Sequence, residues 1–138
     1  MTQLRQLATP LPERFVERKP GGRGGDFVSH DVITQRLLAI VGPFDTDVRE
    51  LIRDPDGTIT GCLLALTCEV DGRPTTIVEV GDVEHAGNAE NNGARAKLAA
   101  SDAIKRCAMR LGVGLHLWSH DDYVLPAWLD REVADDAG

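Results

Sequence analysis

Two turn sequences enclose a long run of alternating apolar residues, and this pattern constrains the fold more than any other feature. Asp54-Pro-Asp-Gly57 precedes the run Thr58–Val70, and Asp71-Gly72 follows it. Alternation at every second residue predicts a strand with one buried face, and Asp-Gly predicts a tight hairpin. We therefore expect an antiparallel meander, whose outer strands are Asp47–Arg53 and Arg73–Val80.

A long helix is predicted after the meander, within the stretch from Asn88 to Trp118, with Asn88 as its cap and with Gly112 and Gly114 at its end. At about 100° per residue, its apolar and basic residues separate onto two faces. Four of the residues on the apolar face are alanines, which predicts close packing on the sheet. The expected core side consists of Ala96, Ala100, Ala103, Ile104, Cys107, Ala108 and Leu111.

Two shorter helices are predicted before the meander. A docking helix is expected within Thr2–Lys19, with Thr9-Pro10 as its start, and a stronger helix over Ser29–Val41 ends at Gly42-Pro43. Together these elements predict an α+β fold. It is an antiparallel three- to four-stranded β-meander packed against a long helix, with shorter N-terminal helices.

The length of 138 residues suits one domain, which we expect over residues 1–129, followed by an acidic, disordered tail at 130–138. No apolar run approaches the roughly 18 residues that a membrane span needs, and the first residues lack the apolar core of a signal peptide. We therefore expect a cytoplasmic protein. The thiols of Cys62, Cys68 and Cys107 have no CxxC spacing and are expected to be buried and free.

The charge distribution is uneven. The formal net charge is −7, which argues against a protein that coats a polyanion. Local fields nevertheless decide where an anion binds, because salt screens charges beyond about 10 Å. The predicted long helix holds five basic residues against one acidic residue between its positions 95 and 110. The five are Arg95, Lys97, Lys105, Arg106 and Arg110.

No enzyme is predicted, because the chain has none of the common nucleotide, hydrolase or metalloprotease motifs. The best metal candidates are His116 and His120 with Asp121 and Asp122. Two histidines four residues apart converge only on a helix, and the nearby glycines argue against one. We therefore predict no catalytic residue, no metal and no cofactor.

Two interpretations of the basic helix stay open on composition alone. It is either a solvated face, on which Asp102 pairs with Lys105 or Arg106, or an anion-binding site. Aromatic residues make up only 4% of the chain, so few rings are spare for stacking bases. A nucleic acid would then be held mainly through its backbone.

One segment resembles a known family. Ser-Asp-Ala-Ile-Lys-Arg at 101–106, followed by Gly112-Val113-Gly114 and Trp118, is similar to the hallmark of the Rad fifty-two-type single-strand annealing proteins, in their short phage or bacterial versions. The similarity extends over roughly Leu7 to Leu129. Phe44 stands where the family commonly has tryptophan, Gly81-Asp82-Val83 replaces a Gly-Tyr-Gly-like loop, and His30 lies near an expected basic groove residue.

The resemblance implies a homo-oligomer, often a ring, that binds single-stranded DNA in a basic groove and anneals complementary strands in homologous recombination and DNA repair, without ATP. Lys105 and Arg106 match the family's DNA-contacting pair, and Lys97 matches an earlier basic position. Arg95 and Arg110 are candidates from the helical wheel alone. A recombinase or a single-strand-binding protein is a further expected partner, in the bacterial nucleoid or the cytoplasm of a phage-infected host.

The alternative belongs to a different class. It is a non-enzymatic structural or regulatory module whose basic helix docks an acidic protein, or the chain's own acidic tail.

Overall fold

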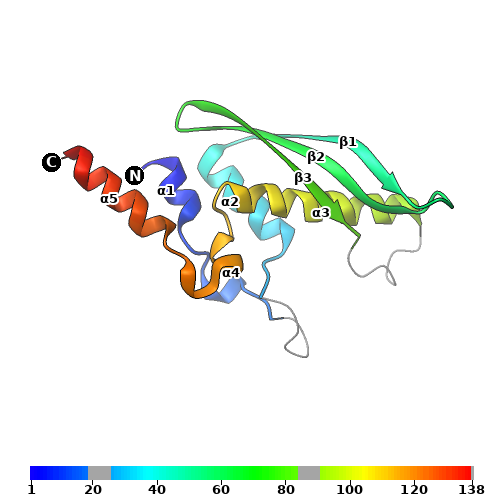
Figure 1. Cartoon of the computed structure of the whole chain (residues 1–138), viewed down its shortest axis with the longest axis horizontal. Helices are drawn as coiled ribbons and strands as arrows, with labels where there is room; N and C mark the ends of the chain where they lie inside the picture. Colours follow the sequence, from blue (N-terminus) through cyan, green and yellow to red (C-terminus); the bar gives the residue numbers. More distant parts are fainter. Residues whose placement is uncertain (19–25, 84–90, 138) are drawn as a thin grey trace.

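The sheet has the predicted meander topology. In the computed structural model, which describes residues 1–18, 26–83 and 91–137, three antiparallel strands pair in the order β1-β2-β3. They are β1 (Asp45–Arg53), β2 (Ile59–Val70) and β3 (Arg73–Asp82). Helices cover one face of this open sheet (Figure 1). The α+β fold class, with a three-stranded meander against a long helix, is confirmed.

The second hairpin shows why Asp-Gly is a strong turn signal. Asp71 and Gly72 have φ values of 50° and 78°, the left-handed region that a two-residue turn between twisted strands requires. The Asp71 carboxylate also accepts hydrogen bonds from the backbone N–H groups of Gln3, at 2.7 Å, and Leu4, at 3.2 Å. The turn therefore anchors the N-terminal helix to the end of the sheet.

Helix α3 spans Asn92–Arg110, so it begins later than the predicted helix. Its cap is Asn91, whose side-chain oxygen accepts the N–H of Ala94 at 2.8 Å; the predicted cap, Asn88, lies outside the described residues. The predicted end of the helix at Gly112 and Gly114 is confirmed, because Gly112 adopts φ 105° and breaks the helix. Residues Leu115–Ser119 form the separate helix α4.

Small residues let α3 lie very close to β3, as the sequence predicted. A Cβ atom built on Gly81 would overlap the carbonyl oxygen of Ala99 and stand 2.6 Å from the amide nitrogen of Ala103. The predicted core face is correct for the buried residues Ala103, Cys107, Ala108 and Leu111, and Ala100 and Ile104 are partly buried against the core. It is wrong for Ala96, which is only half-buried. The face of α3 that meets the sheet is rotated about the helix axis from the predicted one, since it is the face that carries Ala99. Its fully buried residues are Ala99, Ala103, Cys107 and Ala108.

We expect Gly81→Ala to destabilise the fold by about 2–3 kcal/mol, because the added methyl group forces α3 away from β3. The matched control is Gly93→Ala in the exposed first turn of α3, where the new Cβ meets only the Asn91 side chain at 3.2 Å. Alanine favours the helix there by up to about 1 kcal/mol. Urea unfolding of both variants checks this, and equal midpoints for Gly81→Ala and the wild type would contradict it.

The N-terminal helices differ in how well the sequence predicted them. Helix α1 covers Gln3–Ala8 and is capped by the Thr2 hydroxyl, so the predicted start at Thr9-Pro10 is wrong. Thr9 instead lies at the C-terminal end of α1, and a single 3₁₀ turn, η1 (Glu13–Phe15), follows. Helix α2 spans His30–Val41 after Ser29 and ends at Gly42, with φ 75°, as predicted.

The acidic C-terminal segment is helical over its described length, and the disorder expected at 130–138 stays a prediction. After a 3₁₀ turn, η4 (His120–Asp122), helix α5 runs from Leu125 to Ala137. It lies beside α1 (Figure 1), where Arg5 Nε is 2.8 Å from the Asp130 carboxylate. The Tyr123 hydroxyl also donates a hydrogen bond to the carbonyl of Ala8. These contacts, which sequence periodicity does not show, dock the segment.

The hydrogen bond from Arg5 lowers the pKa of Asp130, because it stabilises the carboxylate. A pKa that is depressed in the folded state contributes stability above the unfolded value of about 3.9, and this contribution is lost as the pH falls through the folded value. We expect NMR titration to place Asp130 below that unfolded value. Arg5→Ala should return it to the ordinary range, whereas Arg14→Ala should not. An unshifted Asp130 in the wild type would contradict the docking contact.

The core lies between the sheet and the helices and includes all three thiols. Cys62, Cys68 and Cys107 are buried and free, as predicted. Burial raises the pKa of the Cys107 thiol to about 11, so it stays protonated and unreactive near neutral pH. Among the described residues, no helix has the length and apolar character to cross a membrane.

Candidate nucleic-acid interface

The five basic candidates of α3 lie on different flanks of the helix. Lys97 and Arg106 are nine residues apart, which at about 100° per residue places them on opposite sides. Arg95, Arg106 and Arg110 contact the sheet or α3 itself, whereas Lys97 and Lys105 lie on the side away from those contacts. The predicted basic face is therefore divided.

Arg95 has a structural contact at the start of α3. Its Nε donates a hydrogen bond to the carbonyl oxygen of Ile59 at 2.6 Å. The neighbouring Asn92 accepts the N–H of Ile59 at 3.0 Å and donates to the carbonyl of Gly57 at 3.1 Å. These bonds join the first turn of α3 to the turn between β1 and β2. Arg95 thus positions the helix, with one of its N–H groups already committed.

Arg106 and Arg110 are partly neutralised by acidic partners. Arg106 Nε lies 3.0 Å from the Asp102 carboxylate, one turn earlier, and Arg110 Nε lies 2.8 Å from Glu79 of β3. Asp102 also accepts the backbone N–H of Asp82 at 2.9 Å. This carboxylate therefore fixes α3 to the end of β3 and orients Arg106. Asp102 pairs with Arg106, which is one of the two partners that the solvated-face interpretation predicted. The pair is only partly exposed to solvent.

Lys97, Ser101 and Lys105 form a row, because residues four apart lie on the same side of a helix. The two lysines are separated by about 12 Å along the helix axis, at a rise of about 1.5 Å per residue. Within the described ranges, neither lysine has a carboxylate at ion-pair distance. Lys105 Nζ lies over the Phe27 ring, 5.4 Å from its centroid. We call these three residues the lysine row.

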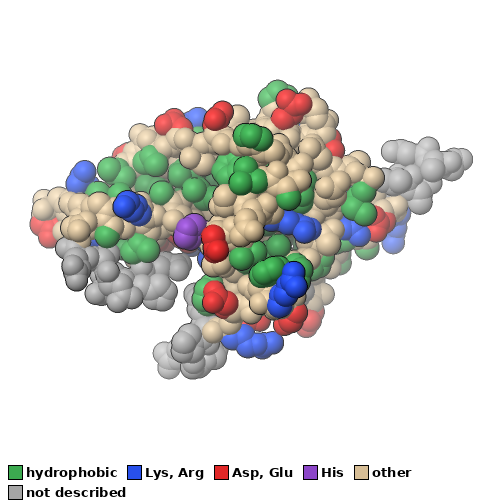
Figure 2. Space-filling model, turned by 180° about the vertical axis from the view of Figure 1, so that it is seen from behind, with side chains coloured by type: hydrophobic (Ala, Val, Ile, Leu, Met, Phe, Trp, Pro, Cys, Tyr) green, Lys and Arg blue, Asp and Glu red, His purple; other side chains and the backbone are tan. Residues whose placement is uncertain are grey.

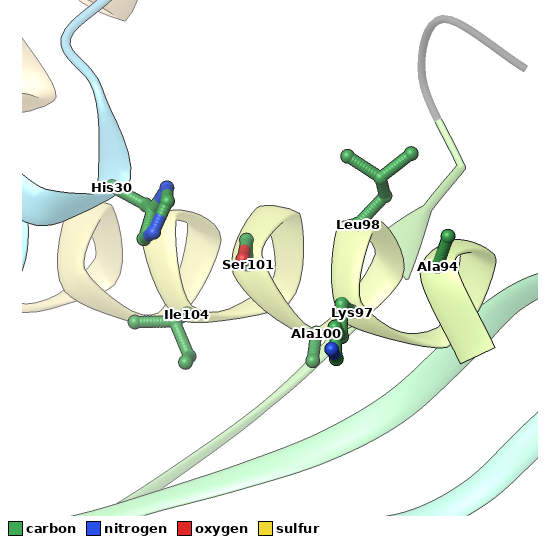
Figure 3. Close-up of a pocket in the computed structure, with 7 residues that line it drawn as sticks. All are labelled: His30, Ala94, Lys97, Leu98, Ala100, Ser101 and Ile104. Carbon is green, nitrogen blue, oxygen red and sulfur yellow. The ribbon is translucent and has the colours of Figure 1, made fainter. Parts of the chain in front are cut away.

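A hollow of about 620 Å³ adjoins the lysine row. Its walls are mainly apolar, and none of the described residues that line it is acidic. Figure 3 shows Lys97, Ala100 and Ile104 pointing to one side of α3, and His30 at the start of α2. The lining residues are His30, Ala94, Lys97, Leu98, Ala100, Ser101 and Ile104. Among the described lining residues, an elongated anion that follows α3 therefore passes no carboxylate.

Apolar surface continues from α3 toward β1. On this side of the molecule, green apolar side chains gather below acidic side chains along the upper edge (Figure 2). Val48 and Leu51 pair with the inward-facing Leu64 and Cys62, so they face the same side of the sheet as α3. They are nevertheless exposed, because α3 lies mainly over β2 and β3.

The opposite face of the sheet is also uncovered in the described parts of the chain. Val78 and Val80 of β3 pair with Ala65 and Leu63 of β2, which places these side chains on the face away from α3. Val78 and Val80 are 41% and 44% exposed. Both edge strands therefore carry apolar side chains that this chain does not bury.

The histidines form no metal site in the described chain, where no group of three His, Cys, Asp or Glu residues is placed to hold an ion. His116 instead lies against Tyr123, with 5.9 Å between ring centroids. Burial lowers the pKa of His116, which favours its neutral form.

Two aromatic side chains at the interface were missed by the sequence reasoning. Lys105 lies over Phe27, and the guanidinium of Arg106 lies 5.7 Å from the ring centroid of Trp118. Trp118 is 58% exposed. Phe27 is remote in sequence from α3, so no spacing signal indicates its contact, and Trp118 was treated only as part of a motif.

Comparisons with protein-family models and with curated proteins find no match. No protein-family model matches the chain, and no curated protein is significantly similar to it. The resemblance to the Rad fifty-two-type proteins thus rests on the motif residues alone.

Proposed function

We propose that this protein is a homo-oligomeric single-stranded DNA-binding protein that anneals complementary strands in recombination and repair, without ATP hydrolysis. The observation that carries the proposal is the lysine row, beside a hollow whose described lining residues include no carboxylate, on a chain whose net charge is −7. Phosphate neutralisation by lysine and arginine supplies most of the affinity in sequence-independent binding. Keeping carboxylates away from such a row matters most in an acidic protein.

The basic residues of α3 have different roles in the proposed function, because they lie on different sides of the helix. Lys97 and Lys105 are the main phosphate contacts, because no described carboxylate pairs with them. Arg106 lies next to Lys105 and extends the positive surface, although Asp102 reduces its charge. Arg95 and Arg110 act chiefly through the fold, since they bind Ile59 and Glu79.

Self-association follows from the same energetics. Two lysines in one copy neutralise few phosphates, whereas a ring of copies repeats the row along one strand and raises the effective concentration of each further contact. The apolar side chains left exposed on β1 and β3 support a second copy as the partner that covers them. The bacterial nucleoid or an infected host cytoplasm is the proposed location, and a recombinase or single-strand-binding protein is the proposed further partner.

The combined variant Lys97→Ala, Lys105→Ala tests the DNA site. Loss of two phosphate contacts should weaken binding to oligo-dT by about 25-fold near 0.1 M salt and reduce the slope of log affinity against log salt by about 1.4, at about 0.7 per phosphate. Fluorescence anisotropy across a salt series measures both. Arginine at both positions should preserve most of the affinity, because the charge is kept.

Arg73→Ala is the matched control, since it removes an exposed charge at the β2–β3 turn, away from the lysine row. It should leave the affinity within about 2-fold. Unchanged oligo-dT binding in the double lysine variant would contradict the assignment of the site. The alternative, a module that docks acidic proteins, predicts that poly-glutamate binds at least as tightly as oligo-dT and depends equally on the lysine row.

A further inference from the structure

Consecutive basic residues of α3 each lie over an aromatic ring, although the rings come from distant parts of the chain. Lys105 Nζ is 5.4 Å from the Phe27 centroid, and Arg106 Cζ is 5.7 Å from the Trp118 centroid. Both distances are within the range of a cation–π interaction, about 6 Å. We call Phe27, Lys105, Arg106 and Trp118 the cation–ring cluster.

The two rings of the cluster differ in what they offer a ligand. Phe27 is half-buried and is held by a β-bridge, in which its N–H and carbonyl bond Glu17 at 2.8 and 2.7 Å. Trp118 stands on the short helix α4 and keeps 58% of its surface exposed. Burying the ring in the core would contribute more to stability than this arrangement does. Trp118 is therefore suited to contact something outside the chain.

The orientation of Arg106 favours a flat ligand at this ring. The guanidinium is fixed by its bond to Asp102, which in turn accepts the N–H of Asp82. The planar guanidinium of Arg106 is therefore already oriented at the Trp118 ring before a ligand binds. Single-strand-binding proteins combine positive grooves with aromatic rings on which bases stack, and arginine adds a cation–π contribution.

We propose that Trp118 is a stacking site for a nucleobase of the bound strand, with Arg106 as its positioning residue and Lys105 as the adjacent phosphate contact. This inference rests on the proposed single-stranded DNA binding and changes it in one respect. The strand is not held by its backbone alone, because at least one base per subunit is gripped while the others stay available for pairing.

Trp128 provides an internal control. It is 59% exposed, almost the same as Trp118, but it lies on α5 two residues before Asp130. Within the described residues, no lysine or arginine lies over its ring. The chain has two tryptophans, so Trp128→Phe leaves Trp118 as the single fluorophore, and Trp118→Phe leaves Trp128.

The first test is fluorescence titration of these two single-tryptophan proteins with oligo-dT. Stacking should strongly quench the emission of Trp118 and leave that of Trp128 nearly unchanged. The Trp118 signal is read in Trp128→Phe, where Trp118 itself is unchanged, so this half of the test does not depend on whether a Trp118 variant folds. Equal responses of the two fluorophores, or no response from Trp118, would overturn the inference.

The second test separates base contacts from phosphate contacts. Trp118→Ala should weaken binding of oligo-dT by about 5- to 100-fold but leave binding of an abasic oligonucleotide of the same length unchanged. Trp118→Phe should retain most of the affinity, since phenylalanine still stacks. An equal loss for both oligonucleotides in Trp118→Ala would overturn the stacking site.

The two proposals fail in different ways. If the wild type binds neither oligonucleotide, the proposed function fails and the stacking site fails with it. If the wild type binds both, and binding needs the lysine row but not Trp118, only the stacking site is wrong.

Discussion

The close contact between α3 and β3 is the constraint on which the rest of the structure depends. A helix can approach a strand this closely only where neither side presents a Cβ that collides, and Gly81 faces the backbone of Ala99 and Ala103 at this point. The contact fixes the rotation of α3 about its axis. Because the rotation is fixed, three arginines turn toward the sheet or the Asp102 carboxylate, and the lysine row turns to the opposite side.

This rotation also explains how an acidic chain presents a local positive surface. Asp102 and Glu79 form ion pairs with Arg106 and Arg110 on the β3 side, so the negative charges of these two carboxylates are neutralised within the fold. Asp130 is likewise paired with Arg5 at the docked C-terminal helix. The two lysines of the row have no such partner in the described chain, and the described residues around the hollow include no carboxylate. A backbone-binding function needs this separation of charge more than a high overall positive charge.

The fold was largely predictable, because its signals are local. Alternation over Thr58–Val70 and the Asp-Gly turns define the meander, and both turns form as expected. The errors arose where a long-range contact decides the outcome. Helix α1 begins after Thr2, where the Asp71 carboxylate accepts the N–H groups of Gln3 and Leu4, rather than at Thr9-Pro10. Helix α3 buries Ala99 against Gly81 rather than Ala96.

The sequence indicated α3 as the candidate site, but it did not show which of the basic residues on α3 bond to other parts of the fold. Composition picked out α3, and the helical wheel already separated Lys97 from Arg106. Sequence spacing alone does not show that Arg110 bonds Glu79 of another strand, or that Phe27 lies beneath Lys105. The sequence likewise did not predict that Trp118 is exposed beside Arg106, because a low aromatic content does not show where the few rings lie.

The central claim is that copies of this chain assemble and bind single-stranded DNA together. Light-scattering mass determination, with and without an oligo-dT long enough to contact several copies, tests both parts in one experiment. The account predicts a mass that is a multiple of the single chain, and a further increase by the mass of the oligonucleotide when DNA is added. A single-chain mass that does not change with oligo-dT would contradict it.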